Sequence, residues 1–262
     1  MDLNLNGKTA IVTGGSRGIG KAVARELAFE GVKVAIASRG IEALEATAKE
    51  IEVETGGSII PIRTDTGSDE SVKQMVTQAA SSLNQLDILV NCAARPLDSG
   101  REPDVEEITE DLFWADMNVK VMGYLRCIRE VASYMKKNQW GRIINISGHA
   151  ARRAGSTIGS MRNVSVVAMT KNLADELGPH GINVIVVHPG LTWTERMPEL
   201  IAERARTQGV STDEVKRQLD LGNSVRKMID AREVAYVVAF LASPKSIAIT
   251  GDVIAAGGGV GN

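Results

Sequence analysis

The chain has 262 residues with a formal net charge of −2, and 44% of its residues are hydrophobic while only 3% are aromatic. A chain with so little net charge has no bulk attraction for nucleic acid or an anionic membrane, so we expect neither partner. Its two cysteines, Cys92 and Cys127, give no disulfide framework and no metal-ligand spacing. The N-terminus has no signal-peptide pattern and no apolar run is long enough to cross a membrane, which favours a cytoplasmic protein.

Short apolar runs alternate with helical patterns along the whole chain. Strands are predicted at residues 9–12, 33–37, 58–62, 87–90, 142–146, 182–187 and 252–254, and helices at residues 21–28, 41–54, 69–83, 116–137, 159–177 and 233–241. This alternation predicts an α/β fold: a doubly wound parallel sheet of the Rossmann type, in three layers and a single domain. Ligands of such sheets bind at the carboxyl ends of the strands.

Two segments interrupt the alternation. Residues 94–104 carry Pro96, Gly100 and Pro103, and are predicted to form a loop at the carboxyl edge of the sheet. Residues from about 192 to 230 are polar, charged and divided into short helical pieces. A segment of this kind is more typical of a lid over a substrate site than of a linker.

A glycine-rich turn follows the first predicted strand, at residues 13–20. Gly14 suits the tight turn, Gly18 lets the backbone approach a pyrophosphate, and Gly20 lets the helix lie close to its strand. The helix that follows offers free N–H groups to phosphates at its N-terminus. In this context the turn predicts a dinucleotide site that includes Gly14, Ser16, Arg17, Gly18, Ile19 and Gly20.

Six motifs resemble those of the short-chain dehydrogenase/reductase family, in the family's order along nearly the whole chain. They are the glycine-rich turn, Asp65, the Asn91-Cys92-Ala93-Ala94 segment, Asn118, residues 183–190 followed by Thr192 and Thr194, and Ile249-Thr250-Gly251. The resemblance implies a dinucleotide cofactor, oxidoreductase activity on a small molecule, and a homo-oligomer (tetramer or dimer) built on the two long helices. It also implies further cofactor-binding residues: Asp65, Thr66, Asn91, Ala93, Asn163, Pro189, Gly190, Thr192 and Thr194.

The end of the second predicted strand bears on the choice of cofactor. An acid there would repel a 2′-phosphate, but the segment reads Ala37-Ser38-Arg39. Arg17 and Arg39 with the Ser38 hydroxyl would form a 2′-phosphate pocket. The alternative is that both arginines are solvated surface charges. We therefore predict a preference for NADP(H), with NAD(H) as the second choice.

The two positions of the family's acid–base pair, Tyr-x-x-x-Lys, are occupied by other residue types in this sequence. Counting back from the pairs at residues 170–171 and 176–177 places its two positions on Gly159 and Asn163. Asn163 keeps the ability to bind a ribose hydroxyl but lacks the charge that lowers a neighbouring pKa. The sequence thus predicts a non-standard active site.

Three residues are candidates for the catalytic role: Asn118, Ser147 and His149. Asn118 matches the family's active-site asparagine. Gly148 takes the position of the family's serine, with Ser147 just before it. His149 has an ordinary pKa near neutrality, although a lone histidine in a loop is more often structural.

We predict an NADP(H)-dependent oxidoreductase acting on a carbonyl or an alcohol, with an atypical site and no metal. Two alternatives remain: a catalytically inactive nucleotide-binding module that regulates or assembles with an active paralogue, and a non-redox lyase or hydrolase. The intact glycine turn disfavours the non-redox enzyme, because it implies that a dinucleotide still binds.

Overall fold

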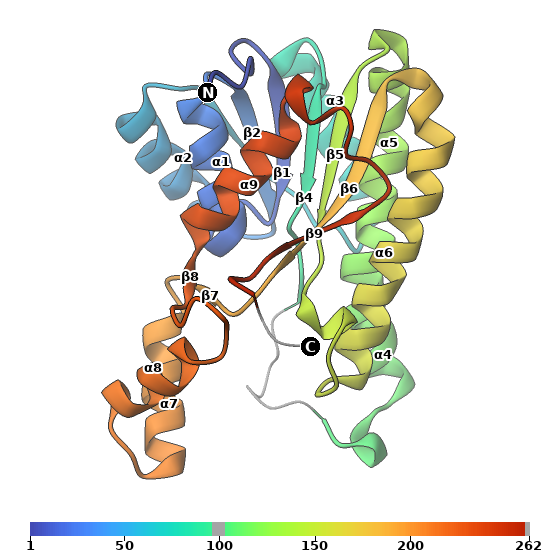
Figure 1. Cartoon of the computed structure of the whole chain (residues 1–262). Helices are drawn as coiled ribbons and strands as arrows, with labels where there is room; N and C mark the ends of the chain where they lie inside the picture. The colour runs from blue at the N-terminus through green and yellow to red at the C-terminus, as the bar shows by residue number, and fades with distance from the viewer. Residues whose placement is uncertain (96–102, 260–262) are drawn as a thin grey trace.

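A computed structural model describes residues 1–95 and 103–259 of the chain, so most of the predicted loop at 94–104 lies outside the described residues. Seven parallel strands form the central sheet in the order β3-β2-β1-β4-β5-β6-β9 (Figure 1). The strands are β1 (Thr9–Thr13), β2 (Lys33–Ser38), β3 (Ile59–Arg63), β4 (Ile88–Asn91), β5 (Gly141–Ile146), β6 (Ile182–Pro189) and β9 (Val253–Ala256). Each of these strands was predicted, within two residues at either end.

Helices cover both faces of this sheet and complete three layers (Figure 1). One face packs against α1 (Gly18–Phe29), α2 (Ile41–Thr55) and α9 (Ala231–Ala242), and the other against α3 (Asp69–Leu83), α5 (Gly123–Asn138) and α6 (Thr157–Leu177). Side chains of one strand alternate between the two cores: Val12 of β1 belongs to the first, and Ile11 to the second. Strands buried on both faces must be apolar throughout, which is why short unbroken apolar runs predict them.

The order of the strands creates a switch point between β1 and β4. From β1 the chain winds outward through β2 to β3, then returns to place β4 on the other side of β1. The connections after β1 and β4 therefore diverge at the carboxyl edge. In doubly wound sheets this is where ligands bind.

The long helix predicted at 116–137 begins earlier and contains an irregular turn. It consists of α4 (Glu110–Met117), a π-helical turn (Asn118–Met122) and α5. Thr109 caps its N-terminus, since its side chain accepts the N–H of Leu112. A π-turn shifts the phase of the helix by one residue, and such turns are frequent at functional sites.

The segment at 192–230 has a small core of its own. Its helices α7 (Met197–Gln208) and α8 (Thr212–Asp220) extend away from the sheet, and the strands β7 (Thr192–Trp193) and β8 (Ile229–Asp230) join them to it (Figure 1). The core of this segment contains Met197, Ile201, Ala205, Val215 and Met228. Its function as a lid stays a prediction. Across the described ranges, no helix is both long and apolar enough to cross a membrane.

Candidate active site

The glycine-rich turn between β1 and α1 packs directly on the chain that leaves β4. Gly14 has a φ of +69°, and a Cβ there would lie 2.9 Å from the Ala93 nitrogen. A Cβ on Gly20 would overlap the carbonyl oxygen of Gly14. Thr13 Oγ1 holds the two segments together by accepting the N–H groups of Cys92 and Ala93 at 3.2 and 3.3 Å. Only glycine fits these positions, so the backbone of the turn packs directly against the segment after β4 at the switch point.

An acidic side chain from the predicted lid reaches the N-terminus of α1. Glu195 Oε2 accepts the N–H of Gly18 at 3.0 Å. Thr194 also lies close to Gly18, since a Cβ on Gly18 would be 3.6 Å from Thr194 Cγ2. The carboxylate therefore takes one of the backbone donors predicted for a phosphate.

The structure brings arginines to the end of β2, where the 2′-phosphate pocket was predicted. Ser38 ends this strand and the exposed Arg39 follows it, while the exposed Arg17 belongs to the turn whose Gly14 and Gly15 N–H groups donate to the Ala37 carbonyl. The β2–β3 register places Arg63 opposite Ser38, which adds a third arginine to the neighbourhood. Sequence reasoning missed Arg63, because only the pairing of the two strands brings it to Ser38.

The residues after β3 bind the start of the π-helical turn. Asp65 Oδ1 accepts the N–H of Gly67 at 2.9 Å, and Thr66 Oγ1 donates to the carbonyl of Val119 at 3.3 Å. The Asn118 amide donates to the carbonyl of Gly67 at 3.2 Å. The structure thus brings Asp65, Thr66 and Asn118 together, with the Asn118 amide engaged by backbone. Its catalytic role stays a prediction.

A chain of buried amides joins β4, β5 and α6. Asn91 Nδ2 donates to Asn145 Oδ1, and Asn145 Nδ2 donates to Thr170 Oγ1, each at 2.9 Å. Asn91 Oδ1 is buried without a partner among the described residues. Buried amides of this kind hold neighbouring elements in a fixed arrangement.

Ser147, Gly148 and Asn163 meet at the carboxyl end of β5. Ser147 Oγ donates to the carbonyl of Asn163 at 3.2 Å, and a Cβ on Gly148 would lie 3.1 Å from Asn163 Nδ2. Asn163 is buried, and its Oδ1 has no partner in the described chain. An orphaned buried acceptor at this edge fits a ribose hydroxyl, which would donate to it.

The two histidines near this edge both have a lowered pKa. Burial lowers the pKa of His188 to about 4, and Arg152 adds to the effect. Burial also lowers the pKa of His149, with Arg152 and Arg153 contributing. His188 Nδ1 accepts the N–H of Gly148 at 3.2 Å, whereas His149 Nε2 is buried without a described partner. Both rings are therefore neutral at pH 7, so His149 is suited to accept a proton rather than to donate one.

Gly159 lies in the first turn of α6, under the cap of that helix. Ser156 Oγ accepts the N–H of Gly159 at 3.0 Å, and a Cβ on Gly159 would lie 2.5 Å from that oxygen. Of the three tyrosines in the chain, Tyr124 is fully buried and donates to the Ile146 carbonyl at 2.8 Å. Tyr134 and Tyr236 lie on α5 and α9.

The chain that leaves β6 carries the last group of predicted cofactor residues. Pro189 ends β6, and Thr192 Oγ1 donates to the carbonyl of Gly190 at 3.0 Å. Thr192 is buried in β7 and Thr194 follows that strand. These residues stand at the same carboxyl edge as Ser147, because β5 and β6 are parallel neighbours.

Two further charged groups lie at this edge, and the first of them, Lys120, was not predicted. Lys120, in the π-helical turn, is only 4% exposed, and its Nζ donates to the Ser147 carbonyl at 3.1 Å. Arg162 Nη1 contacts both carboxylate oxygens of Asp116 at 2.7 and 2.8 Å. The signal for Lys120 was its spacing from Tyr124 and Cys127, which belong to the buried stripe of the helix.

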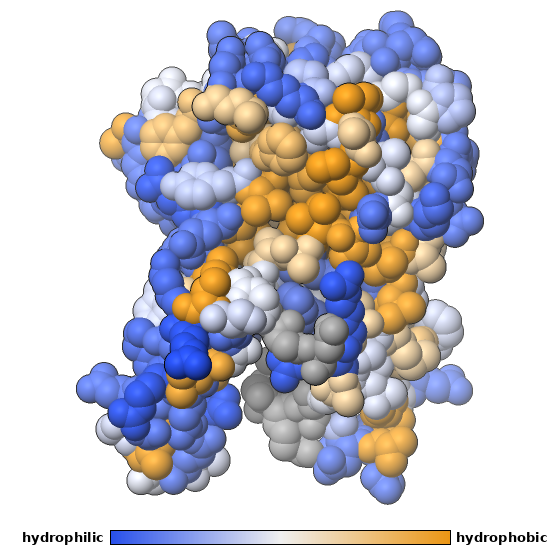
Figure 2. Space-filling model, viewed as in Figure 1, coloured by the Kyte–Doolittle hydropathy of each residue, from blue (hydrophilic) through white to orange (hydrophobic). Residues whose placement is uncertain are grey.

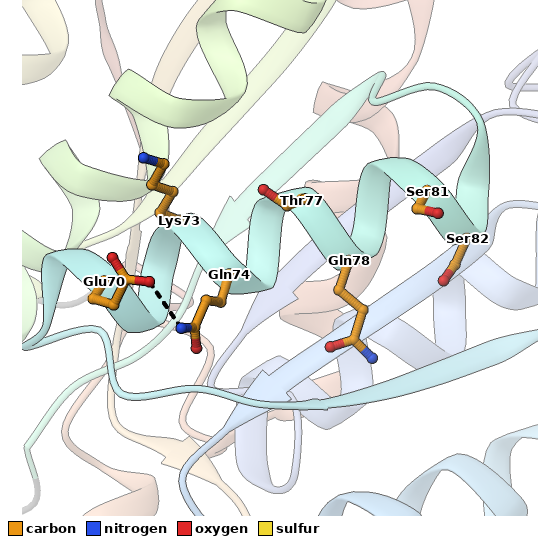
Figure 3. A pocket seen from close by; sticks show the side chains of 7 residues that line it. All are labelled: Glu70, Lys73, Gln74, Thr77, Gln78, Ser81 and Ser82. Atoms are coloured by element: carbon orange, nitrogen blue, oxygen red, sulfur yellow. Dashed lines mark hydrogen bonds between the residues drawn. The ribbon is translucent and has the colours of Figure 1, made fainter.

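A surface depression along α3 lies apart from these residues (Figure 3). Its lining comes from one helix, and Gln74 there donates to Glu70 at 2.8 Å. None of the predicted site residues lines it. Within the described residues, no group of three or more His, Cys, Asp or Glu side chains is placed to hold a metal ion.

Comparison with known proteins agrees with this geometry. A family model of the short chain dehydrogenases matches residues 8–205. The NADPH-dependent reductase BacG of Bacillus subtilis (strain 168) is 30% identical over 256 residues, which cover 96% of this chain and 97% of BacG. The short-chain reductase protein NovJ of Streptomyces niveus is 34% identical over 251 residues, covering 95% of this chain and 92% of NovJ.

A solved structure supports the same assignment. The actinorhodin polyketide ketoreductase with NADPH superposes with a TM-score of 0.89 at 29% identity, covering 97% of each chain. The predicted fold class and the predicted resemblance are both confirmed. Because the family model spans most of the chain and both relatives match nearly end to end, the chain belongs to the short-chain dehydrogenase family.

Proposed function

We propose that this protein is an NADP(H)-dependent oxidoreductase that interconverts a carbonyl and an alcohol on a small molecule, with a non-standard active site. The observation that carries the proposal is the close backbone contact at the switch point, where Gly14 and Gly20 leave no room for side chains. The orphaned Asn163 Oδ1 is a second feature that fits the cofactor. BacG is named as NADPH-dependent, and the ketoreductase structure contains NADPH. Both support the choice of cofactor.

Each part of the cofactor has residues to bind it. The N–H groups at the start of α1 bind the pyrophosphate, and Arg17, Arg39 and Arg63 near Ser38 bind the 2′-phosphate. Asp65 binds the adenine, Asn163 the ribose, and Thr192 with Thr194 the nicotinamide amide, as the family resemblance implies. When bound, the nicotinamide supplies or accepts the hydride.

The chain's own contribution is to hold the substrate and move its proton. Ser147 and His149 at the end of β5 are candidates for contact with the substrate oxygen. The segment at 192–230 is proposed as the lid, because Glu195 already reaches the start of α1. Orienting a hydride donor against a carbonyl supplies much of the rate acceleration by itself.

The second candidate function is an inactive nucleotide-binding module. The observation that favours it is that Gly159 and Asn163 occupy the usual acid–base positions, with Gly159 beneath the α6 cap. The buried Tyr124 does not replace the missing tyrosine, because its hydroxyl donates to backbone. The two functions differ in turnover. Binding of the cofactor is common to both.

The test is NADPH oxidation with a panel of small ketones and aldehydes. We expect absorbance at 340 nm to fall with at least one compound, with one alcohol formed for each NADPH consumed. NADPH bound tightly without turnover on a broad panel would contradict the oxidoreductase and leave the binding module.

Replacing Arg39 with alanine tests the 2′-phosphate pocket. Loss of a charge-assisted contact should weaken NADPH binding roughly tenfold or more, while NADH binding changes less than about threefold. Fluorescence titration measures both constants. Arg206→Ala, at an exposed position of α7, is the matched control. Equal losses for the two nucleotides would mean that Arg39 does not contact the 2′-phosphate.

Replacing Glu195 with glutamine tests the contact of the lid with α1. The carboxylate repels the pyrophosphate and shares the Gly18 donor, so its neutralisation should tighten NADPH binding about threefold to tenfold. Isothermal titration calorimetry measures the effect, and Glu199→Gln on α7 is the control. Weaker binding in Glu195→Gln would show instead that the carboxylate supports the bound form.

We also propose that the chain forms a homo-oligomer through α5 and α6. Tyr134 of α5 and Met161 and Val164 of α6 are exposed apolar side chains that a second subunit would cover. A second apolar region lies in the middle of the face in Figure 2, around β9 and the segment before it. Light scattering should give a dimer or tetramer at micromolar concentration, and Val164→Glu should reduce its mass. A monomer in the unmodified protein would contradict this assembly.

A further inference from the structure

Lys120 is a buried cation that belongs neither to the proposed cofactor site nor to the catalytic candidates Asn118, Ser147 and His149. It lies in the π-helical turn, and its ammonium makes one hydrogen bond among the described residues, to the Ser147 carbonyl at the end of β5. That carbonyl precedes Gly148, where a Cβ would lie 3.1 Å from Asn163 Nδ2. Lys120 is only 4% exposed, and its hydrogen bond to Ser147 places it at the carboxyl edge of the sheet, among the predicted site residues.

The groups that face Lys120 leave it without a carboxylate of its own. Asp116 is nearby, but both of its oxygens are bound by Arg162. Burial raises the pKa of the Cys92 thiol at the end of β4 to about 12, so it stays neutral. His188 of β6 is also neutral at pH 7, because burial lowers its pKa to about 4.

The remaining neighbour is an aromatic ring on the same helix. The ring of Tyr124 lies 6.0 Å from Lys120 Nζ, and the hydroxyl of that tyrosine donates to the Ile146 carbonyl. No ion pair of Lys120 is present in the described chain. An ammonium with one neutral acceptor in a desolvated position is poised to lose its proton.

We propose that Lys120 is the proton donor for carbonyl reduction, and the proton acceptor for alcohol oxidation, in this active site. The proposal rests on the proposed function. It assigns to a lysine of the π-helical turn the role for which Gly159 and Asn163 have no suitable group. It also differs from the choice of His149, whose neutral ring at pH 7 has no additional proton to give.

The step balances with the cofactor class already named. Reduction of a carbonyl forms a C–H bond with the hydride from the nicotinamide and an O–H bond with a proton. The Lys120 ammonium breaks one N–H bond to supply that proton and becomes a neutral amine. The amine then takes a proton from water, and oxidation of an alcohol reverses each of these changes.

The pH dependence follows from the position of Lys120. Burial, with Arg162 adding and Asp116 opposing, lowers the pKa of Lys120 from 10.5 to about 7. Reduction needs the ammonium, so its rate should fall as pH rises through about 7. Oxidation needs the neutral amine, so its rate should rise over the same interval.

Two substitutions at this position separate proton transfer from charge. Lys120→Met keeps roughly the length of the side chain and removes the amine. Lys120→Arg keeps a positive charge that does not titrate in this range. We expect both to lower kcat for reduction about 100-fold, with the dissociation constant of NADPH and KM changed less than about threefold. Lys171→Met, at an exposed position of α6, is the control. Melting temperatures establish that each variant is folded.

An NMR titration of the Lys120 amine tests the proposal independently of turnover. In protein labelled with ¹³C-lysine, the Cε resonance that disappears in Lys120→Met should titrate near pH 7. A midpoint near the ordinary lysine value would overturn the proposal, as would full activity in Lys120→Met or rescue by Lys120→Arg. In each of these cases turnover by the unmodified protein would still support the proposed function. Absence of turnover in the unmodified protein, with NADPH bound, would overturn both.

Discussion

The contact of backbone with backbone at the switch point determines what the rest of the carboxyl edge can do. The turn after β1 reaches the chain leaving β4 so closely that a single added methyl group at Gly14 would meet the Ala93 nitrogen. Thr13 fixes this approach through its hydroxyl, which accepts two N–H groups of the facing segment. The start of α1, the proposed dinucleotide site and the position of Cys92 all depend on this contact, because each belongs to one of the two segments.

Three polar atoms at the same edge lack hydrogen-bond partners among the described residues. They are Asn91 Oδ1, His149 Nε2 and Asn163 Oδ1, all of them buried. Each such group lowers stability, by an amount of order 1–3 kcal/mol when it is left unpaired. They lie near the ends of β4, β5 and α6, whereas the two cores on the faces of the sheet are aliphatic. A ligand bound at this edge would supply the missing hydrogen bonds and offset that cost.

Much of the fold could be predicted from the sequence, because its strands are short apolar runs and its helices have clear polar faces. The glycine turn was also predictable, since its three glycines stand at the spacing a phosphate site requires. Arg63 was not, because it reaches Ser38 only through the β2–β3 register. Lys120 was missed for a related reason. A lysine is ordinarily assigned to a solvated face, so its spacing from the buried Tyr124 and Cys127 was not taken as a sign of burial.

The separate core of α7 and α8 has a consequence for how such a protein changes over generations. Met197, Ile201 and Val215 pack among themselves and not into the two cores that hold the sheet. Substitutions there can reshape the proposed lid while the main body keeps its stability. Selection for a new substrate and selection for a stable fold therefore act on different sets of residues, which allows one scaffold to diversify its chemistry without first being rebuilt.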